Sequence, residues 1–329
     1  MRKRKWVLYW ALNPVYLAFG VGIVALFTLS GIGIWAWTQN KPAPPIPTVY
    51  RAGGVSAPSP IGDAVIPFAD ALKGGSLAVA LPDGTVRRYT PDYPNGLSLA
   101  GLRGDQPFVV GGGDWVIAPC VTTTAKLCWA DNVGMIDSRA TEGILPVLSA
   151  DHKAIYSYLQ TGTGYILQRT PLEGSEVESI LTVTLPAAPA LPDPATGRLL
   201  IVDQQTPKSA AFYTVDPNCV GDMACSASAW QIKVVAGVIE GVAWHPSATA
   251  IAFSERASGT IYALSTANGA ISPLVTGVLG GAWQPAFSLD GTRLAFLRGD
   301  GQLGILDVET GRSGLLPILG TRFVWLPPY

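Results

Sequence analysis

The chain has 329 residues with 22 basic and 23 acidic side chains, which gives a formal net charge of −1. Charged residues make up 14% of the chain and hydrophobic residues 48%, and there are 37 Gly and 27 Pro. This composition excludes a disordered chain, because there are enough apolar residues for a core, and it is typical of a loop-rich all-β protein. The length alone is compatible with two domains or with one large all-β domain.

The first part of the chain has the pattern of a membrane anchor. Four basic residues lie in "MRKRKW", and no charge occurs over residues 15–37. As a helix, these residues would be about 35 Å long, enough to cross the ~30 Å hydrocarbon core of a bilayer. We predict that residues 1–14 form a cytoplasmic basic and interfacial segment, that 15–37 cross the lipid bilayer as a single transmembrane helix, and that the rest is extracytoplasmic, in the periplasm or at the cell exterior. A cleaved signal peptide is the alternative, although its apolar core is usually only about 7–15 residues long.

A Pro-rich segment follows the predicted anchor. Residues 38–60 include "KPAPPIPTVYRAGGVSAPSP", which is typical of a semi-rigid linker. We therefore expect the extracytoplasmic domain to occupy residues 61–329. After the first 41 residues the chain carries 17 basic and 23 acidic groups, which argues against nucleic acid as a partner.

The four cysteines form two local pairs, Cys120 with Cys128 and Cys219 with Cys225. Each pair falls between apolar runs, and outside the cytoplasm thiols are usually paired, so we predict two local disulfides. A four-Cys zinc site is the alternative. Neither pair has the short Cys-x2-4-Cys spacing of a zinc ribbon, and this favours the disulfides.

The last third of the chain contains a repeated unit. In "AFSLDGTRLAFLRGDGQLGILDVETG", residues 286–311, Asp-Gly and Thr-Gly pairs separate short apolar runs. This pattern predicts antiparallel strands joined by tight turns. A similar unit, "AWHPSATAIAFSERASGTIYALSTANG" at 243–269, lies 43 residues upstream, and fainter copies begin near Ser76, Pro107, Val147 and Ala190.

A repeat of about 40–45 residues with four strands is the signature of β-propeller blades. The segments "AFSLDGTRLAF" and "LGILDVETG" resemble the repeat of TolB-like, WD-type β-propellers. The resemblance covers about two-thirds of the predicted extracytoplasmic domain; it implies the fold and carries over no catalytic residue. We therefore expect a six-bladed propeller, or a seven-bladed one if the 53-residue interval between Ala190 and Ala243 holds a further blade.

The chain ends on a segment that resembles only the first strand of a blade. In "FVWLPPY", Val324 and Trp325 correspond to Ala243 and Trp244. The first repeat, near Ser76, has no clear opening strand. We predict that the C-terminal strand pairs into the first blade and closes the ring, which would remove an exposed sheet edge.

Motifs for catalysis, metal binding or cofactor binding are lacking in the sequence, so we predict no enzymatic activity, no metal and no cofactor. His152 and His245 lie in different repeats and are expected to be structural, and Asp290-Gly291 is interpreted as a turn. Six tryptophans could line a binding face but are more often core residues: Trp115, Trp129, Trp230, Trp244, Trp283 and Trp325.

The function predicted from the sequence is that of a non-catalytic accessory or interaction subunit. Its partners would be other membrane or extracytoplasmic proteins, in a cell-envelope or an electron-transfer assembly. The alternative is an enzyme or a small-ligand or glycan binder with a site at the central channel, and fold alone does not decide between them.

Overall fold

The computed structural model describes residues 65–73, 75–99, 143–149, 151, 153–171, 176–219, 224–226 and 229–326, together with the backbone of the strands between 109 and 140. The predicted segments 1–14, 15–37 and 38–60 lie outside these residues. Within the described part, no helix is both long enough and apolar enough to cross a membrane.

The described strands pair into six four-stranded antiparallel sheets. The first contains β1 (Ser76–Ala80), β2 (Val86–Tyr89), β3 (Leu97–Ser98) and β24 (Arg322–Leu326). The second contains β4 (Val109–Val110), β5 (Val116–Cys120), β6 (Thr123–Asp131) and β7 (Gly134–Ala140). The third contains β8 (Ile144–Leu148), β9 (Ala154–Gln160), β10 (Tyr165–Pro171) and β11 (Glu178–Val183). The fourth contains β12 (Leu191–Pro192), β13 (Leu199–Thr206), β14 (Ser209–Val215) and β15 (Trp230–Ala236). The fifth contains β16 (Ile239–Trp244), β17 (Ala250–Glu255), β18 (Thr260–Ser265) and β19 (Ile271–Val275). The sixth contains β20 (Ala282–Phe287), β21 (Arg293–Arg298), β22 (Gln302–Asp307) and β23 (Ser313–Leu319).

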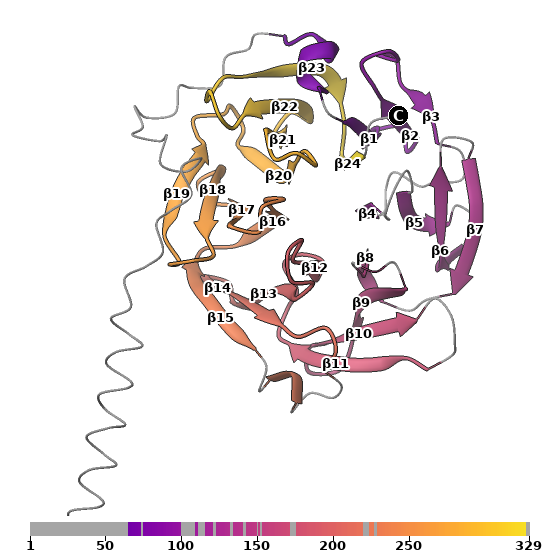
Figure 1. Cartoon of the computed structure of the whole chain (residues 1–329), viewed down its shortest axis with the longest axis vertical. Coiled ribbons are helices and arrows are strands. Elements are labelled where there is room, and N and C mark those ends of the chain that lie inside the picture. Colours follow the sequence, from indigo (N-terminus) through magenta and orange to yellow (C-terminus); the bar gives the residue numbers. More distant parts are fainter. Residues whose placement is uncertain are drawn as a thin grey trace, which may run out of the picture. The chain divides into compact units, whose positions relative to one another are not determined.

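The sheets follow one another around a circle, which is the arrangement of a β-propeller (Figure 1). The strands β4, β8, β12, β16, β20 and β24 surround the centre, and the other three strands of each sheet lie progressively farther out. Side chains are described for five of the sheets, and the sheet β4–β7 is described by its strands alone. The all-β propeller fold expected from the repeat is present.

Stacking of the sheets explains why so many strands are apolar on both faces. All five residues of β1 are buried, and so are five of six in β17. Two of the outermost strands differ, since β15 and β19 are mostly exposed. A strand in the middle of a sheet packs against a neighbouring sheet on each face, whereas an outer strand borders solvent. The core is therefore a series of clusters between successive sheets.

The C-terminal strand β24 joins the first sheet. It pairs antiparallel with β1, with Trp325 opposite Leu77 and Val324 opposite Ala78. This is the pairing that the sequence predicts. Trp325 is 3% exposed and belongs to the cluster between the first and sixth sheets. The strand thereby completes the first sheet from residues far away in the chain.

A second connection across the same junction was missed by sequence reasoning. Val65 forms a parallel bridge with Leu315 of β23, and the Ile66 amide donates to the Leu315 carbonyl at 2.9 Å. The short helix α4 (Phe68–Ala71) follows, and Ala71 and Leu72 are buried against the first and sixth sheets. The segment 65–72 thus straps the outer edge of the sixth sheet just before the chain begins the first.

Within the described residues, the 53-residue interval between Ala190 and Ala243 contains one sheet, β12–β15, and the seven-bladed alternative finds no further sheet there. Its extra length is the connection from β14 to β15. In that connection Cys219 and Cys225 form a disulfide with a Cα–Cα distance of 5.1 Å. Cys120 and Cys128 lie in β5 and β6, outside the side chains that the structure describes, so their pairing stays a prediction.

Candidate functional site: the mouth of the central channel

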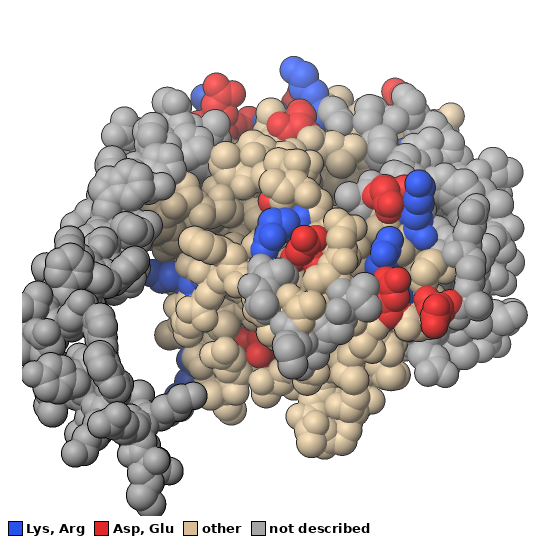
Figure 2. All heavy atoms as spheres, turned by 60° about the horizontal axis from the view of Figure 1, so that its bottom comes forward, with Lys and Arg blue, Asp and Glu red and all other residues tan. Residues whose placement is uncertain are grey.

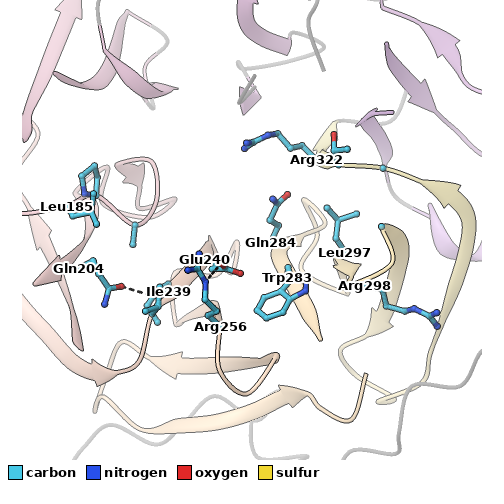
Figure 3. Close-up of a pocket in the computed structure, with 17 residues that line it drawn as sticks. Leu185, Gln204, Ile239, Glu240, Arg256, Trp283, Gln284, Leu297, Arg298 and Arg322 are labelled. Atoms are coloured by element: carbon cyan, nitrogen blue, oxygen red, sulfur yellow. Dashed lines mark hydrogen bonds and ion pairs between the residues drawn. The ribbon is translucent and has the colours of Figure 1, made fainter. Parts of the chain in front are cut away.

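A cavity of about 760 Å³ lies at one end of the ring, where β16, β20 and β24 begin (Figure 3). Its wall is built from the first residues of these inner strands, from the ends of the second strands β13, β17 and β21, and from the connections between sheets. The lining includes Leu185, Gln204, Glu240, Arg256, Trp283, Gln284, Arg298, Thr321 and Arg322. Binding sites commonly occur at such an open end of a closed β-structure.

Irregular pairing of the inner strands shapes this wall. In β20 the register shifts between Trp283 and Ala286, so that two residues face one on β21. The same shift occurs in β8 between Ile144 and Val147. A β-bulge of this kind bends the strand and redirects a side chain, and bulges are frequent beside functional sites.

The two bulges share an unusual backbone conformation. Gln284 and Leu145 both have a left-handed φ, of 50° and 52°, and a proline follows each of them. Such a conformation costs on the order of 1–3 kcal/mol in a residue other than glycine and persists only where the surroundings enforce it. Part of the enforcement is visible at Gly241, where an added Cβ would lie 2.7 Å from the Gln284 Cα. Strands β16 and β20 therefore meet backbone to backbone and hold Gln284 in place.

Gln204 fixes the wall between the fourth and fifth sheets. Its Nε2 donates to the carbonyls of Thr206, Ser209 and Gly237 at 2.7, 3.1 and 2.9 Å, and its Oε1 accepts from the Ile239 amide at 3.1 Å. Figure 3 shows the contact to Ile239. With its amide group fully engaged, Gln204 is a structural part of the wall, and it sets where β16 begins.

Charged side chains on the lining are mostly neutralised by their neighbours. Arg256 forms an ion pair with Glu240, and Arg298 forms one with Asp300. Elsewhere on the described surface, basic and acidic side chains also lie next to one another in small groups, and uncharged residues separate these groups (Figure 2). Exposed pairs of this kind contribute little to stability, about 0–1 kcal/mol each, but they remove free charge from the wall.

Arg322 is different from the other cationic residues of the lining. It is partly buried at the start of β24, and within the described part of the chain its side chain has neither an ion pair nor a hydrogen bond. Burial lowers the pKa of its guanidinium, because removal of water disfavours the charged form. An Arg side chain nevertheless stays protonated in proteins, so the cavity keeps one uncompensated positive charge.

The cavity continues into the channel itself. A second space of about 400 Å³ is lined by the inner strands and shares Ala187, Glu240, Gln284 and Arg322 with the first. Beyond these four, its lining is apolar: Leu145, Val147, Pro285, Ala286, Phe287 and Leu289 are among its residues. The site is therefore an apolar well with a polar collar of Glu240, Gln284 and Arg322.

Two of the predicted tryptophans hold successive sheets together. The Trp325 Nε1 donates to the Ala286 carbonyl at 2.9 Å, and the Trp244 Nε1 donates to the Leu191 carbonyl at 3.1 Å. In both cases the donor lies on an inner strand and the acceptor on the inner strand of the preceding sheet. Trp283 does line the mouth, whereas Trp230 is 71% exposed on the outer strand β15. The side chains of Trp115 and Trp129 lie outside the described ones.

His245 is placed as the sequence predicts, in a structural position. It is 8% exposed, its ring packs edge-on against Phe287 at 4.9 Å, and its Nδ1 accepts from the Ser247 amide at 3.2 Å. Burial lowers the pKa of the imidazole, and a hydrogen bond to the Gly291 backbone opposes this shift. His152 lies outside the described residues.

Asp290-Gly291 is a turn, as expected. The Asp290 Oδ1 accepts from the Thr292 amide at 3.0 Å and from the Ser288 hydroxyl at 2.6 Å, and the Ser288 hydroxyl oxygen accepts from the Arg293 amide at 2.9 Å. Ser149 and Asp151 repeat this arrangement before β9. The carboxylate is thus occupied by its own loop.

No family model matches the chain, and no curated protein does. Among solved structures, the chain is similar to TolB from Acinetobacter baumannii over 77% of its own length and 67% of that chain, with a TM-score of 0.58 and 16% identity. It is equally similar, with a TM-score of 0.58 and 12% identity, to a chain of a nidogen/laminin complex, over 77% of this chain and 98% of the other. The likeness is one of fold. At these identities it supports a β-propeller and leaves activity and partners open.

Sequence reasoning did not find the residues of the collar. Glu240, Gln284 and Arg322 belong to no motif, and they come together only because three inner strands begin at the same end of the ring. One signal was available in the sequence. A proline follows Leu145 and also Gln284, and these two residues lie at the bulge in the first strand of two different repeats.

Proposed function

We propose that this protein is a membrane-anchored, extracytoplasmic propeller that binds partner proteins through the mouth of its channel, as a non-catalytic accessory subunit of a membrane assembly. The observation that carries the proposal is the open mouth cavity, whose wall is held rigidly by backbone contacts and by Gln204. A rigid concave surface on a ring loses little conformational freedom on binding, and this favours recognition.

The chemistry of the lining supports recognition over catalysis. Its carboxylate, Glu240, is paired with Arg256, and its Arg298 is paired with Asp300. A general acid or base needs a free path for proton transfer, and a carboxylate held in an ion pair lacks one. The partners would be other membrane or extracytoplasmic proteins and not nucleic acid.

The extracytoplasmic location is supported by the Cys219–Cys225 disulfide, because disulfides persist mainly in oxidising compartments. It is also supported by the basic cluster before the uncharged residues 15–37. N-terminal sequencing of the native protein tests the anchor. A mature chain that starts after residue 37 would replace the anchor by a cleaved signal peptide.

Site-specific photo-crosslinking in intact cells tests the docking surface. A photoreactive residue at Thr321, exposed on the rim of the cavity, should give a discrete protein adduct. The same residue at Asn268, exposed but outside the lining, is the matched control and should give none. Adducts of equal yield at both positions, or none at Thr321, would contradict the proposal.

A further inference from the structure

We infer that the collar of the channel is a binding site for a carboxylate group attached to an apolar body, with Arg322 as the anion-binding residue and Gln284 as the second donor. This goes beyond the proposed function, because it holds for a free organic acid as well as for a carboxylate that a partner protein presents.

The charge balance of the lining is the first reason. Glu240 with Arg256 and Arg298 with Asp300 are neutral as pairs, and Arg322 remains as one positive charge. A partly desolvated charge without a partner is unfavourable, and an anion of matching charge relieves this. A carboxylate carries one negative charge and so neutralises the collar. A phosphate dianion would leave a surplus negative charge close to Glu240.

The donors are the second reason. The guanidinium of an Arg presents parallel N–H groups that match the two oxygens of a carboxylate. The Gln284 amide has no hydrogen bond to any described residue, and both side chains line both parts of the cavity. In Figure 3, Arg322 and Gln284 extend from their strands into the space enclosed by the lining.

The backbone at Gln284 is the third reason. Its left-handed φ and the bulge of β20 are kept at a cost, and the backbone of Gly241 holds it there. Leu145 has the same conformation in β8 and places an apolar side chain in the same channel. The same backbone strain thus occurs at equivalent positions of two inner strands, and both side chains line the channel. This indicates a site that is organised before the ligand binds.

The apolar lining of the channel determines which chemical group the ligand carries beside its carboxylate. Below the collar the lining is apolar, with Pro285, Phe287 and Leu289 among its residues. A ligand that leaves its carboxylate at the collar therefore buries an aliphatic or aromatic body in the channel, which adds affinity through the hydrophobic effect.

The test is a binding titration of the full chain in mild detergent, measured by calorimetry. The probes are 4-phenylbutyrate, its neutral amide, and two blocked pentapeptides, Gly-Leu-Glu-Leu-Gly and Gly-Leu-Gln-Leu-Gly. We expect at least one acid to bind and its neutral partner to bind at least about tenfold more weakly. Binding of the small acid alone identifies a free acid as the ligand source, and binding of the peptide alone identifies a protein.

Variants connect the binding to the collar. Arg322→Gln should lower the affinity for the acid at least about tenfold, and Arg322→Lys should lower this affinity less because the charge is kept. The matched control is Arg312→Gln, which removes the same charge from an exposed position outside the cavity and should leave the affinity unchanged. Gln284→Leu should lower the affinity for the acid about three- to tenfold.

Unfolding curves of each variant without ligand verify that the fold is kept. The inference is overturned if acid and amide bind equally, if Arg322→Gln and Arg312→Gln have the same effect, or if none of the four probes binds. The crosslinking at Thr321 does not depend on these probes. If the titration fails, the proposed docking function still stands, and if the crosslinking fails, the proposed carboxylate site still stands.

Discussion

At the scale of single residues, Gly291 is a position where both the backbone conformation and a close neighbour disfavour an added methyl group. Its φ is +74°, and an added Cβ would lie 2.5 Å from the His245 Nε2. Gly291→Ala should lower the free energy of unfolding by about 2–4 kcal/mol, the sum of backbone strain and overpacking.

A matched control separates these two causes. Gly311 has a similar φ of +70°, but nothing lies within 4 Å of its added Cβ. Gly311→Ala should therefore cost only the strain, about 1–2 kcal/mol. Chemical denaturation of both variants measures the difference, and equal costs would show that the contact with His245 is relieved by a small shift.

His245 should make stability depend on pH. Its pKa is lowered in the folded state by burial, so the unfolded chain binds the proton more readily. Stability is then fully present above about pH 6.5, the unfolded pKa, and falls as the pH drops toward the lower folded pKa.

The variant His245→Ser tests this, because Ser149 and Ser288 occupy the same place in two other repeats. The free energy of unfolding should change less between pH 7 and pH 5 in the variant than in the parent chain. Since His152 is present in both proteins, its contribution cancels in the comparison. Parallel pH profiles would contradict the assignment.

At the scale of elements, the strands meet through side chains that bridge two sheets. Trp325→Phe removes the hydrogen bond to the Ala286 carbonyl but keeps a ring in the core, and should cost about 1–2 kcal/mol. Trp325→Ala also empties the pocket and should cost about 3–5 kcal/mol. Trp230→Ala, on the exposed face of β15, should change stability by less than about 0.5 kcal/mol. Thermal unfolding ranks the three, and a cost for Trp230→Ala that equals that of Trp325→Ala would refute the ranking.

The disulfide in the β14–β15 connection should be a moderate stabiliser. It joins cysteines six residues apart, and a loop of this length is worth about 2 kcal/mol on the chain-entropy model. The double variant Cys219→Ser/Cys225→Ser should lose about that amount relative to the oxidised parent when both are unfolded without reductant. Non-reducing peptide mapping of the same samples will show whether Cys120 and Cys128 are paired.

Strand elements were predictable from sequence because their signals are local. The Asp-Gly and Thr-Gly turns, the alternation of apolar runs with turn residues, and the 43-residue offset all lie within short stretches of the chain. The collar was not predictable, since Glu240, Gln284 and Arg322 become neighbours only through the ring. The strap formed by Val65 and Ile66 was missed for the same reason: nothing in those two residues points to Leu315.

At the scale of the whole described domain, two long-range contacts hold the first and last sheets together. Strand β24 completes the first sheet, and the segment 65–72 straps β23 of the sixth. Deletion of residues 322–329 should leave the β1 edge unpaired and the Trp325 pocket empty, and the domain should aggregate. Deletion of residues 61–73, which include this strap, should lower the melting temperature and keep the domain monomeric, because the sheets themselves remain paired. Size-exclusion chromatography and thermal unfolding of residues 61–329 and 74–329 and of the C-terminal deletion measure this. A C-terminal deletion that stayed monomeric and melted like the parent would refute closure by β24.

The pairing of β24 with β1 also sets a waiting time during protein synthesis. The Thr321 amide donates to the Ala80 carbonyl across 241 residues of chain. At typical elongation rates, on the order of 10–50 s pass between the synthesis of the first partner and that of the second. For most of that interval β1, β2 and β3 have all been made, while the innermost position of the first sheet is empty. The nascent chain therefore carries an open hydrogen-bonding edge until β24 has been made, and this strand decides whether the ring closes on itself or pairs with another molecule.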